Sequence, residues 1–515
     1  MIVVGQIKKG AYFDSVTLMQ CGKKIASLAG VVDATVVMGT KSNRAILSAS
    51  GLMIPKFDDT GDTDLLIAVK ADDDRTAQAA LAAVDGILKD SRKQSSTSGE
   101  TQPASMEGAL EALPDANLAM ISVAGRYAGA EAMKALEHGM HVMLFSDNVS
   151  LETEIELKTF AESKGLLVMG PDCGTAIING VPLAFANSVK RGDIGIVAAA
   201  GTGLQEVSCI ISNKGAGVSQ AIGTGGRDVR KEVGGIMFLA ALKALADDEQ
   251  TRVILLVSKP PHPEVLERIS AATKAISKPV VSMFVGAAAG ADPATLEEAA
   301  LVAVALSRGE DPITVRHQLA ARDLEIHQQA TREAANKTKS QRYLRGLFSG
   351  GTFCAEAQIL FKDMLTDVYS NAPAGNAMCL KDSLKSEKNT VIDLGEDEFT
   401  VGRPHPMIDY SLRNRRIAEE AADPECAVIL LDVILGYGAN ADPASELFSV
   451  IVQASKTVTV VCSVTGTDSD PQDRSTVAKR LAEAGAIVMP SNAAACNFAG
   501  DIVRLLGGNA LAHTV

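Results

Sequence analysis

The feature that most constrains the fold of this chain is a strand, glycine turn and helix pattern that occurs twice. Residues 194–206 run from an apolar segment through a glycine turn into Gly-Thr, and residues 347–356 repeat this outline about 150 residues later. In both copies a glutamate, Glu206 or Glu356, follows the threonine by four residues. The chain therefore contains a duplicated α/β unit. Each copy begins a helix whose unpaired N–H groups can hold an anion.

The segments that follow the two copies also correspond. Strand-like runs occur in the same order after each copy, at 253–257 and 278–282 in the first and at 428–432 and 456–461 in the second. Ahead of the repeats, apolar runs at 118–123, 142–145 and 166–169 alternate with helical stretches. This alternation is typical of parallel sheets covered by helices.

The remaining segments complete the predicted organisation. The N-terminal part shows strand-like runs at 13–19, 31–38 and 64–69, a helical segment between the first two of them, and an alanine-rich helical run at 75–88. The polar residues 91–106 predict a linker, residues 311–340 a charged helical connection, and residues 371–390 an exposed insertion. The sequence therefore predicts an α/β protein of four domains. They are a small ferredoxin-like domain at 1–90, a Rossmann-like domain at 107–188, and two flavodoxin-like domains at 190–310 and 340–515.

Composition excludes several function classes. The net charge of −13, with no long basic stretch, argues against a nucleic-acid surface. No apolar run reaches the roughly 18 residues that a membrane span needs. The 8 cysteines are scattered without a CxxC pair or a Cys/His cluster, which argues against a metal site and favours reduced thiols. We therefore expect a cytoplasmic protein without a bound metal.

The strongest local candidate for an anion site is the turn Gly201, Thr202 and Gly203, which directly follows an apolar strand. A helix that begins there leaves partial positive charge at its N-terminus. Gly351 and Thr352 hold the matching position in the second copy. In both places the alternative is that glycine only permits the bend of the chain.

A second candidate is the pair Gly436 and Gly438, which follows the strand-like run at 428–432. Ligands bind at the carboxyl ends of strands in open parallel sheets. The alternative is an ordinary strand-to-helix loop, capped by Asp442 with Pro443 at the first helical position.

Four side chains are candidates for catalysis: Glu206, Arg227, Arg403 and His405. Arg227 and Arg403 lie in matching glycine-containing loops, and a guanidinium can bind phosphate or carboxylate through two hydrogen bonds. His405 lies between two prolines and can titrate near neutral pH. For each of these loop residues a solvated surface position is the alternative.

Two segments resemble the α subunit of succinyl-CoA synthetases: Met-Gly-Pro-Asp-Cys-Gly at 169–174, and residues 192–206 around Gly-Thr-Gly. The segment 431–438 is similar to the ligase domain of the β subunit. The resemblance covers about residues 110–515, and fusion of α-like and β-like halves identifies the chain as a member of the FdrA-like acyl-CoA synthetase family. It implies a CoA-binding-type domain at 107–188 and synthetase-type ligase domains at 190–310 and 340–515.

In that family two helix N-termini face each other and stabilise a phosphorylated histidine. By resemblance Gly201, Thr202 and Glu206 belong to the first helix, and Gly436 and Gly438 to the second. This chain departs from the pattern, because no histidine occurs between His262 and His317. The family's glycine-rich CoA-phosphate loop and its nucleotide-grasp domain also have no counterpart here. A phosphohistidine relay within the chain is therefore not expected.

Three functions remain open from the sequence. The first is an acyl-CoA synthetase-like subunit that binds a phosphate or acyl phosphate between two helix N-termini. The second is a carbamoyltransferase component that uses carbamoyl phosphate and an oxamate-like acid. The third is a non-catalytic scaffold or regulatory subunit. The resemblance implies CoA or carbamoyl phosphate as ligand, a small acid as substrate, and a homo-oligomer or a complex with further subunits. From charge and hydropathy we expect neither nucleic acid nor membrane partners.

Overall fold

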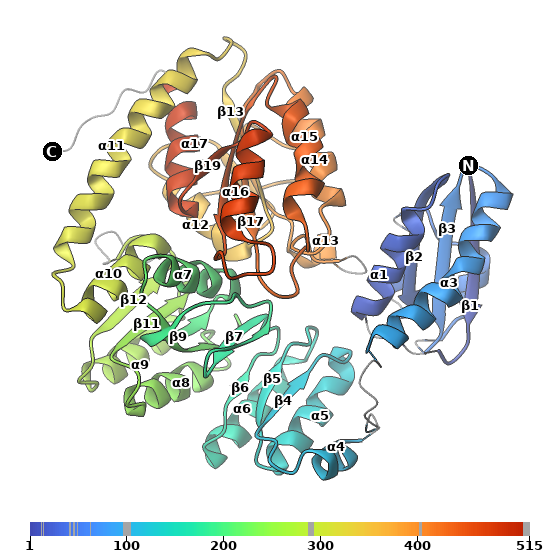
Figure 1. Ribbon diagram of the computed structural model, residues 1–515, viewed down its shortest axis with the longest axis horizontal. Helices are drawn as coiled ribbons and strands as arrows, with labels where there is room; N and C mark the ends of the chain where they lie inside the picture. The colour runs from blue at the N-terminus through green and yellow to red at the C-terminus, as the bar shows by residue number, and fades with distance from the viewer. Residues whose placement is uncertain are drawn as a thin grey trace. The chain divides into compact units, whose positions relative to one another are not determined.

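The computed structural model describes residues 1–507 except 12, 14, 41, 42, 45, 46, 49, 62, 96–102, 104, 287–292 and 401–403. Its ribbon is drawn in Figure 1. Contacts divide the chain into two compact units. The first comprises Met1–Asp115 and Asp397–His405, and the second comprises Ala116–Glu396 and Pro406–Val515.

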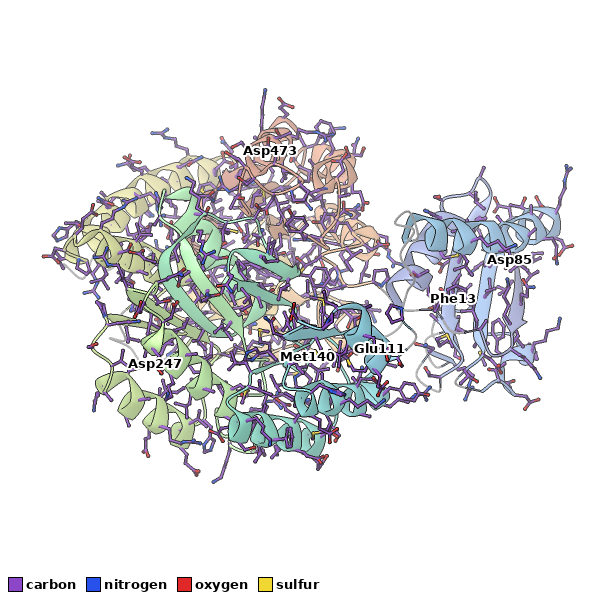
Figure 2. All side chains as sticks on the ribbon, turned by 60° about the horizontal axis from the view of Figure 1, so that its bottom comes forward. Phe13, Asp85, Glu111, Met140, Asp247 and Asp473 are labelled. Carbon is purple, nitrogen blue, oxygen red and sulfur yellow. The ribbon has the colours of Figure 1, made fainter. Side chains whose placement is uncertain are left out.

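The first unit is built on a three-stranded antiparallel sheet of order β1-β3-β2. Its elements are β1 (Ile2–Lys8), α1 (Ser15–Ala26), β2 (Val31–Met38), the short helix η1 (Pro55–Phe57), β3 (Leu65–Ala71), α3 (Asp74–Ser95), α4 (Met106–Ala112) and α13 (Asp397–Thr400). Asp85 of α3, labelled in Figure 2, is exposed, with 65% of its side-chain surface accessible. Helix α3 extends into the segment that the sequence predicted as a linker, most of whose remainder lies outside the described residues.

The strand predicted at 13–19 is wrong, because α1 begins at Ser15. Leu18, Cys21 and Ile25 are all buried in the core of this unit. Their spacing of three and four residues places them on one face of a helix. This burial outweighs the local strand preference of the β-branched residues at the start of the segment.

The second unit begins with a three-stranded parallel sheet of order β4-β5-β6. Its elements are β4 (Leu118–Ile121), α5 (Gly125–Glu137), β5 (His141–Leu144), α6 (Leu151–Lys164) and β6 (Val168–Met169). The predicted alternation of strands and helices is therefore present in this part of the chain.

The first repeat forms a six-stranded sheet of order β12-β11-β9-β10-β7-β8. Its strands are β7 (Thr175–Ile178), β8 (Val181–Ala184), β9 (Arg191–Ala199), β10 (Val218–Gly223), β11 (Val253–Ser258) and β12 (Val280–Phe284). Its helices are α7 (Gly201–Asn213), α8 (Ile236–Asp247), α9 (Pro263–Lys274) and α10 (Leu296–Arg308). The four strands from β12 to β10 are parallel, and β7 and β8 extend the sheet antiparallel.

The second repeat forms a seven-stranded parallel sheet of order β15-β14-β16-β13-β17-β18-β19. Its strands are β13 (Tyr343–Phe348), β14 (Val368–Ser370), β15 (Met378–Cys379), β16 (Asn389–Asp393), β17 (Cys426–Ile434), β18 (Thr459–Thr465) and β19 (Ile487–Met489). Its helices are α12 (Gly351–Phe361), α14 (Ser411–Ala422), α15 (Pro443–Ala454), α16 (Arg474–Glu483) and α17 (Asn492–Leu506), and α11 (Ile313–Ala335) connects the repeats.

The topology confirms the duplication that the sequence indicated. In the first repeat β9 lies between β11 and β10 and leads into α7; in the second, β13 lies between β17 and β16 and leads into α12. One hydrophobic cluster includes buried side chains of both sheets and of both helices, among them Leu204 of α7 and Phe353 of α12. The α/β fold class is therefore as predicted, and the two repeats share a core.

The segment 371–390, predicted as an exposed insertion, is integrated into the second repeat. Strand β15 pairs with β14, Leu380 is buried, and residues 371–375 line a cavity. Within the described part of the chain, no helix is long and apolar enough to cross a membrane.

Candidate functional site

The first turns of α7 and α12 pack against each other. A Cβ atom added to Gly203 would lie 3.0 Å from Cγ2 of Thr352, and one added to Gly350 would lie 3.0 Å from Thr202. No side chain caps either helix, since the N-cap residues are Ala200 and Gly350. Two helix N-termini with uncapped N–H groups therefore lie side by side, one from each repeat.

The turn before α12 is held by a buried carboxylate of β17. Asp432 accepts hydrogen bonds from the amides of Ser349 at 2.8 Å and Gly350 at 2.7 Å. Its Oδ1 also pairs with Nη2 of Arg413 at 2.6 Å, and both side chains are fully buried. These contacts fix the start of α12 from the neighbouring strand.

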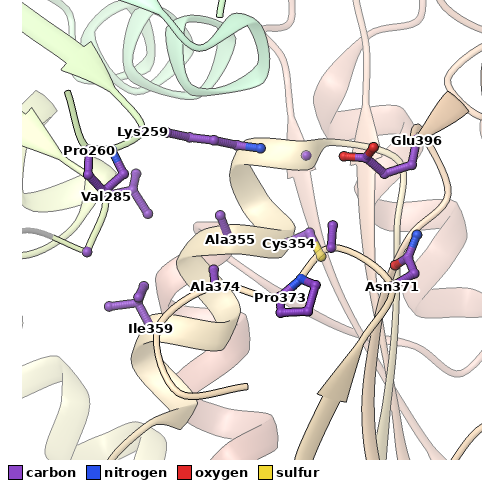
Figure 3. Close-up of a pocket in the computed structure, with 14 residues that line it drawn as sticks. Lys259, Pro260, Val285, Cys354, Ala355, Ile359, Asn371, Pro373, Ala374 and Glu396 are labelled. Carbon is purple, nitrogen blue, oxygen red and sulfur yellow. The ribbon is translucent and has the colours of Figure 1, made fainter. Parts of the chain in front are cut away.

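A cavity of about 480 Å³ lies at this end of α12 (Figure 3). It is lined by Lys259, Pro260, Val285, Gly286, Gly351, Cys354, Ala355, Ile359, Asn371, Ala372, Pro373, Ala374, Gly375 and Glu396. The first four follow β11 and β12 of the first repeat, and the others belong to the second. The cavity is therefore formed by both repeats at the carboxyl ends of their strands, where ligands of parallel sheets bind.

Lys259 directly follows β11, and its side chain extends toward α12 (Figure 3). Its Nζ lies 3.8 Å from the position of a Cβ on Gly351. Among the residues that the structure describes, no carboxylate forms an ion pair with this ammonium group. A cation and a helix N-terminus thus border the same cavity, a combination that favours an anionic ligand.

Asp393, the last residue of β16, lies beside this cavity and is 3% exposed. Its Oδ1 accepts a hydrogen bond from the Gly395 amide at 2.9 Å, and its Oδ2 lies 2.7 Å from the position of a Cβ on Gly351. Burial raises the pKa of this carboxyl to about 7, an effect that Glu396 and Asp432 reinforce and that the Gly395 amide and Lys259 oppose. Asp393 therefore titrates near neutral pH.

Sequence reasoning missed both Lys259 and Asp393. Lys259 follows a predicted strand by two residues, so its place at the carboxyl end was available as a signal. Asp393 follows the apolar pair Val391 and Ile392 at the end of a strand, but the residues before this pair were predicted to form an insertion, so the strand was missed.

Gly201, Thr202 and Gly203 of the first repeat and Gly351 and Thr352 of the second lie together at two neighbouring helix starts. Gly201 is exposed, and the nearest atom to a Cβ added there is Oγ1 of Thr175 at 3.7 Å. Gly203 and Thr352 form the contact between the helices, and Gly351 lines the cavity. Whether these residues bind an anion remains a prediction.

Glu206 and Glu356 each accept a hydrogen bond from a helix of the other repeat. Glu206 of α7 accepts from the Asn492 amide at 3.0 Å, at the first residue of α17. Glu356 of α12 accepts from the Leu296 amide at 2.8 Å, at the first residue of α10, and from Nδ2 of Asn492 at 2.8 Å. Thr465 also donates to Glu206, at 2.6 Å. Each glutamate therefore holds the N-terminus of a helix in the opposite repeat.

Arg227 is held away from the lining of the cavity. Its Nε pairs with Glu154 of α6 at 2.8 Å, and its Nη2 donates to the Val149 carbonyl at 2.8 Å. Glu154 also pairs with the buried Lys158, which pairs with Asp228. Arg227 thus belongs to an ion-pair network that joins α6 to the loop after β10.

The remaining two catalytic candidates are Arg403 and His405. Arg403 lies outside the described residues. His405 is half-buried and belongs to the segment Asp397–His405, which groups with the first unit.

Gly436 and Gly438 do not begin a helix, contrary to the expectation from the resemblance. Helix α15 begins only at Pro443, with Asp442 as its cap. A Cβ on Gly436 would lie 2.7 Å from the Ala186 carbonyl, and one on Gly438 would lie 2.8 Å from the ring of Phe185. Both residues also have positive φ angles, so glycine here lets the loop pack closely against the segment after β8. The helix start that packs against the start of α7 is that of α12.

Three family models match the chain. The AllF heavy metal-associated domain matches residues 1–104, the CoA binding domain matches 189–286, and the CoA-ligase model matches 347–502. The CoA-binding match covers the first repeat, so the assignment of 107–188 to a CoA-binding-type domain stays a prediction. Among the described residues, no group of three or more His, Cys, Asp or Glu side chains could hold a metal ion.

The chain is also similar to individual proteins. The chain is 41% identical to the uncharacterized protein YahF of Escherichia coli over 503 residues, which are 94% of this chain and 96% of YahF. It is 26% identical to the succinate–CoA ligase α subunit 2 of Archaeoglobus fulgidus over 33% of this chain, and it spans only 60% of that subunit. The acetyl-coenzyme A synthetase 1 of Candidatus Korarchaeum cryptofilum, solved with phosphate and ADP, aligns over 77% of this chain and 85% of its own, with 14% identity and a TM-score of 0.29.

Proposed function

The chain belongs with YahF to the FdrA-like family of acyl-CoA synthetase-related proteins, and we propose that it binds a phosphorylated small acid at the start of α12. The observation that carries the proposal is the pair of uncapped helix starts, with the Lys259 ammonium beside Gly351. Helix N-termini and ammonium groups are the elements that proteins use to hold phosphoryl groups.

The proposed ligand occupies the cavity through its phosphoryl group. The free N–H groups of the first turn of α12 and the Lys259 ammonium would bind the phosphoryl oxygens. The rest of the acid would extend along the wall formed by residues 371–375. A cavity of about 480 Å³ is large enough for a small acyl phosphate and an attacking second substrate.

The reaction that fits this arrangement is acyl transfer from the phosphorylated acid. Catalysis would come from positioning and from stabilising the charge that develops on the leaving phosphate. Such a reaction needs no phosphohistidine, in keeping with the lack of histidine between His262 and His317. Carbamoyl phosphate with an oxamate-like acid is the pair that we propose to test first. CoA is the other acceptor to test, because the CoA-binding and CoA-ligase matches support it as a ligand.

The test measures phosphate release from carbamoyl phosphate in the presence of oxamate, other small amides, or CoA. We expect release that depends on one of these acceptors. We also expect no acid-labile phosphate on the protein after incubation with labelled ATP. A labelled histidine would contradict the proposed transfer without a relay.

A non-catalytic scaffold predicts a different result. In that case neither CoA nor carbamoyl phosphate would change the unfolding temperature. A ligand that binds the folded state and is present at about 100 times its dissociation constant stabilises by about 2.7 kcal/mol. If neither ligand raised the unfolding temperature, the proposed binding site would be contradicted. This measurement needs no partner subunit, because it detects binding and not turnover.

A further inference from the structure

The carboxylate of Asp393 lies beside the proposed anion site, and its Oδ2 atom has no hydrogen-bond partner among the described residues. Oδ1 accepts from the Gly395 amide, but no described residue donates to Oδ2. The backbone of Asp393 is fixed on both sides by Asn371, whose Oδ1 accepts from the Asp393 amide and whose Nδ2 donates to its carbonyl, each at 2.9 Å. The side chain is therefore held in place with one acceptor unused.

This unused acceptor points at the start of α12. Gly351 is the residue between Asp393 and the cavity, since its absent Cβ would lie 2.7 Å from Oδ2 and 3.8 Å from the Lys259 ammonium. Because residue 351 has no side chain, the carboxylate oxygen and the ammonium border the same space. A ligand held by Lys259 and the α12 amides would bring its anionic group next to Asp393.

Two negative groups cannot lie in contact in a buried site unless a proton lies between them. We infer that Asp393 restricts this site to ligands that carry a hydrogen-bond donor beside their anionic group. The donor would be an O–H of a phosphate or an N–H of a carbamoyl group bonded to the phosphate. The inference rests on the proposed function, because it assumes that the start of α12 holds an anion.

The surroundings of Asp393 favour this role. Four charged or titratable groups act on it. They are Glu396 in the loop after β16, Lys259 directly after β11, Asp432 on β17 and Cys354 on α12. Only Lys259 is cationic, and burial together with the carboxylates brings the pKa of Asp393 to about 7. Above this pH the group is an acceptor only; below it, Asp393 can itself donate to a bound anion.

Phosphate and sulfate give a direct test, since they have nearly the same size but hydrogen phosphate retains a proton at a pH of about 8.5 and sulfate does not. Titration calorimetry of the full chain should show sulfate affinity falling about ten-fold per pH unit above about pH 7.5, because Asp393 must first take up a proton. Phosphate affinity should change much less. Equal pH dependence of the two anions would overturn the inference, and this comparison needs no variant.

Asp393→Asn and Glu396→Gln separate hydrogen bonding from charge. The side-chain amide introduced by D393N can donate to either anion, so this variant should bind sulfate independently of pH and within about three-fold of phosphate. E396Q removes a charge from the same cavity and should strengthen the binding of both anions, but sulfate affinity should still fall with rising pH while phosphate affinity changes much less. A ratio that changes equally in both variants would mean that only net charge matters, and would contradict a specific role of Asp393.

The requirement for a donor also applies to the proposed substrate. The NH₂ group of carbamoyl phosphate can donate a hydrogen bond, whereas the methyl group of acetyl phosphate cannot. We therefore expect carbamoyl phosphate to bind at least about ten-fold more tightly than acetyl phosphate. D393N should reduce this preference. If the wild-type protein binds carbamoyl and acetyl phosphate equally, the inference fails while the proposed function stands. If it binds none of these anions, the proposed function fails first.

Discussion

At the scale of single residues, the carboxylates of the repeats have separate tasks. Glu206 and Glu356 are buried and accept hydrogen bonds from helix N-termini of the opposite repeat, whereas Asp393 keeps an oxygen without a partner beside the cavity. The sequence showed that the two glutamates correspond, and it suggested Glu206 for catalysis. It could not show their partners, because Asn492 lies 286 residues from Glu206 along the chain.

Glu356 should make stability depend on pH. Burial raises its pKa from 4.5 to about 7, so between these values the folded state holds a proton that the unfolded chain has lost. Stability should therefore fall as the pH rises from about 4.5 to 7, by about 3 kcal/mol in all. Glu356→Gln should remove this contribution, because a glutamine side chain does not titrate. Its carbonyl oxygen can still accept the hydrogen bond from the Leu296 amide or from Nδ2 of Asn492.

Urea unfolding of wild type and E356Q at about pH 5 and about pH 8 measures this difference. Glu162→Gln, an exposed substitution on α6, is the control and should leave the pH dependence unchanged. If E356Q kept the wild-type pH dependence, Glu356 would not be the group responsible.

At the scale of elements, the contact between α7 and α12 brings the two halves of the site together. The contact depends on small residues, because a Cβ on Gly203 would lie 3.0 Å from both Thr352 and Val257. Gly201, two residues earlier on the same helix, has no neighbour closer than 3.7 Å at that position.

The two glycines of α7 therefore form a matched pair for mutation. Gly203→Ala should lower the free energy of unfolding by about 1–3 kcal/mol through overpacking. Gly201→Ala should leave it unchanged or raise it by about 0.5–1 kcal/mol, because alanine favours the helix. Denaturant midpoints of both variants test this, and equal effects would show that the helices do not pack as described.

Much of the element pattern could be predicted, because buried parallel strands are apolar runs that can be recognised locally. The repeats were found in this way, and so were β11, β12, β17 and β18 of the two sheets. Strand β16 was missed because only Val391 and Ile392 among its residues are strongly apolar, and the start of α1 was mistaken for a strand. The pairing of α7 with α12, rather than with the loop at Gly436, depends on contacts between residues far apart in sequence.

At the scale of the whole molecule, the chain consists of two compact units, and all residues that line the proposed site belong to the second. The sheets of the two repeats share one hydrophobic core, so this unit should not need the N-terminal residues to fold. The first unit matches the model of a heavy metal-associated domain.

A variant that begins at Ala116 should therefore remain folded and keep its phosphate affinity within about two-fold of the full chain. Circular dichroism and calorimetric titration test both statements. A folded variant that has lost its affinity would show that residues of the first unit contribute to the site.

The central claim, that the start of α12 and Lys259 hold a phosphoryl group, is tested most directly by titrating carbamoyl phosphate into wild-type protein and Lys259→Met. A hydrogen bond to a charged group is worth about 1.5–3 kcal/mol, so K259M should bind at least about ten-fold more weakly. Lys274→Met, which removes an exposed lysine at the end of α9, should bind like the wild type. Equal affinity of K259M and wild type would contradict the claim.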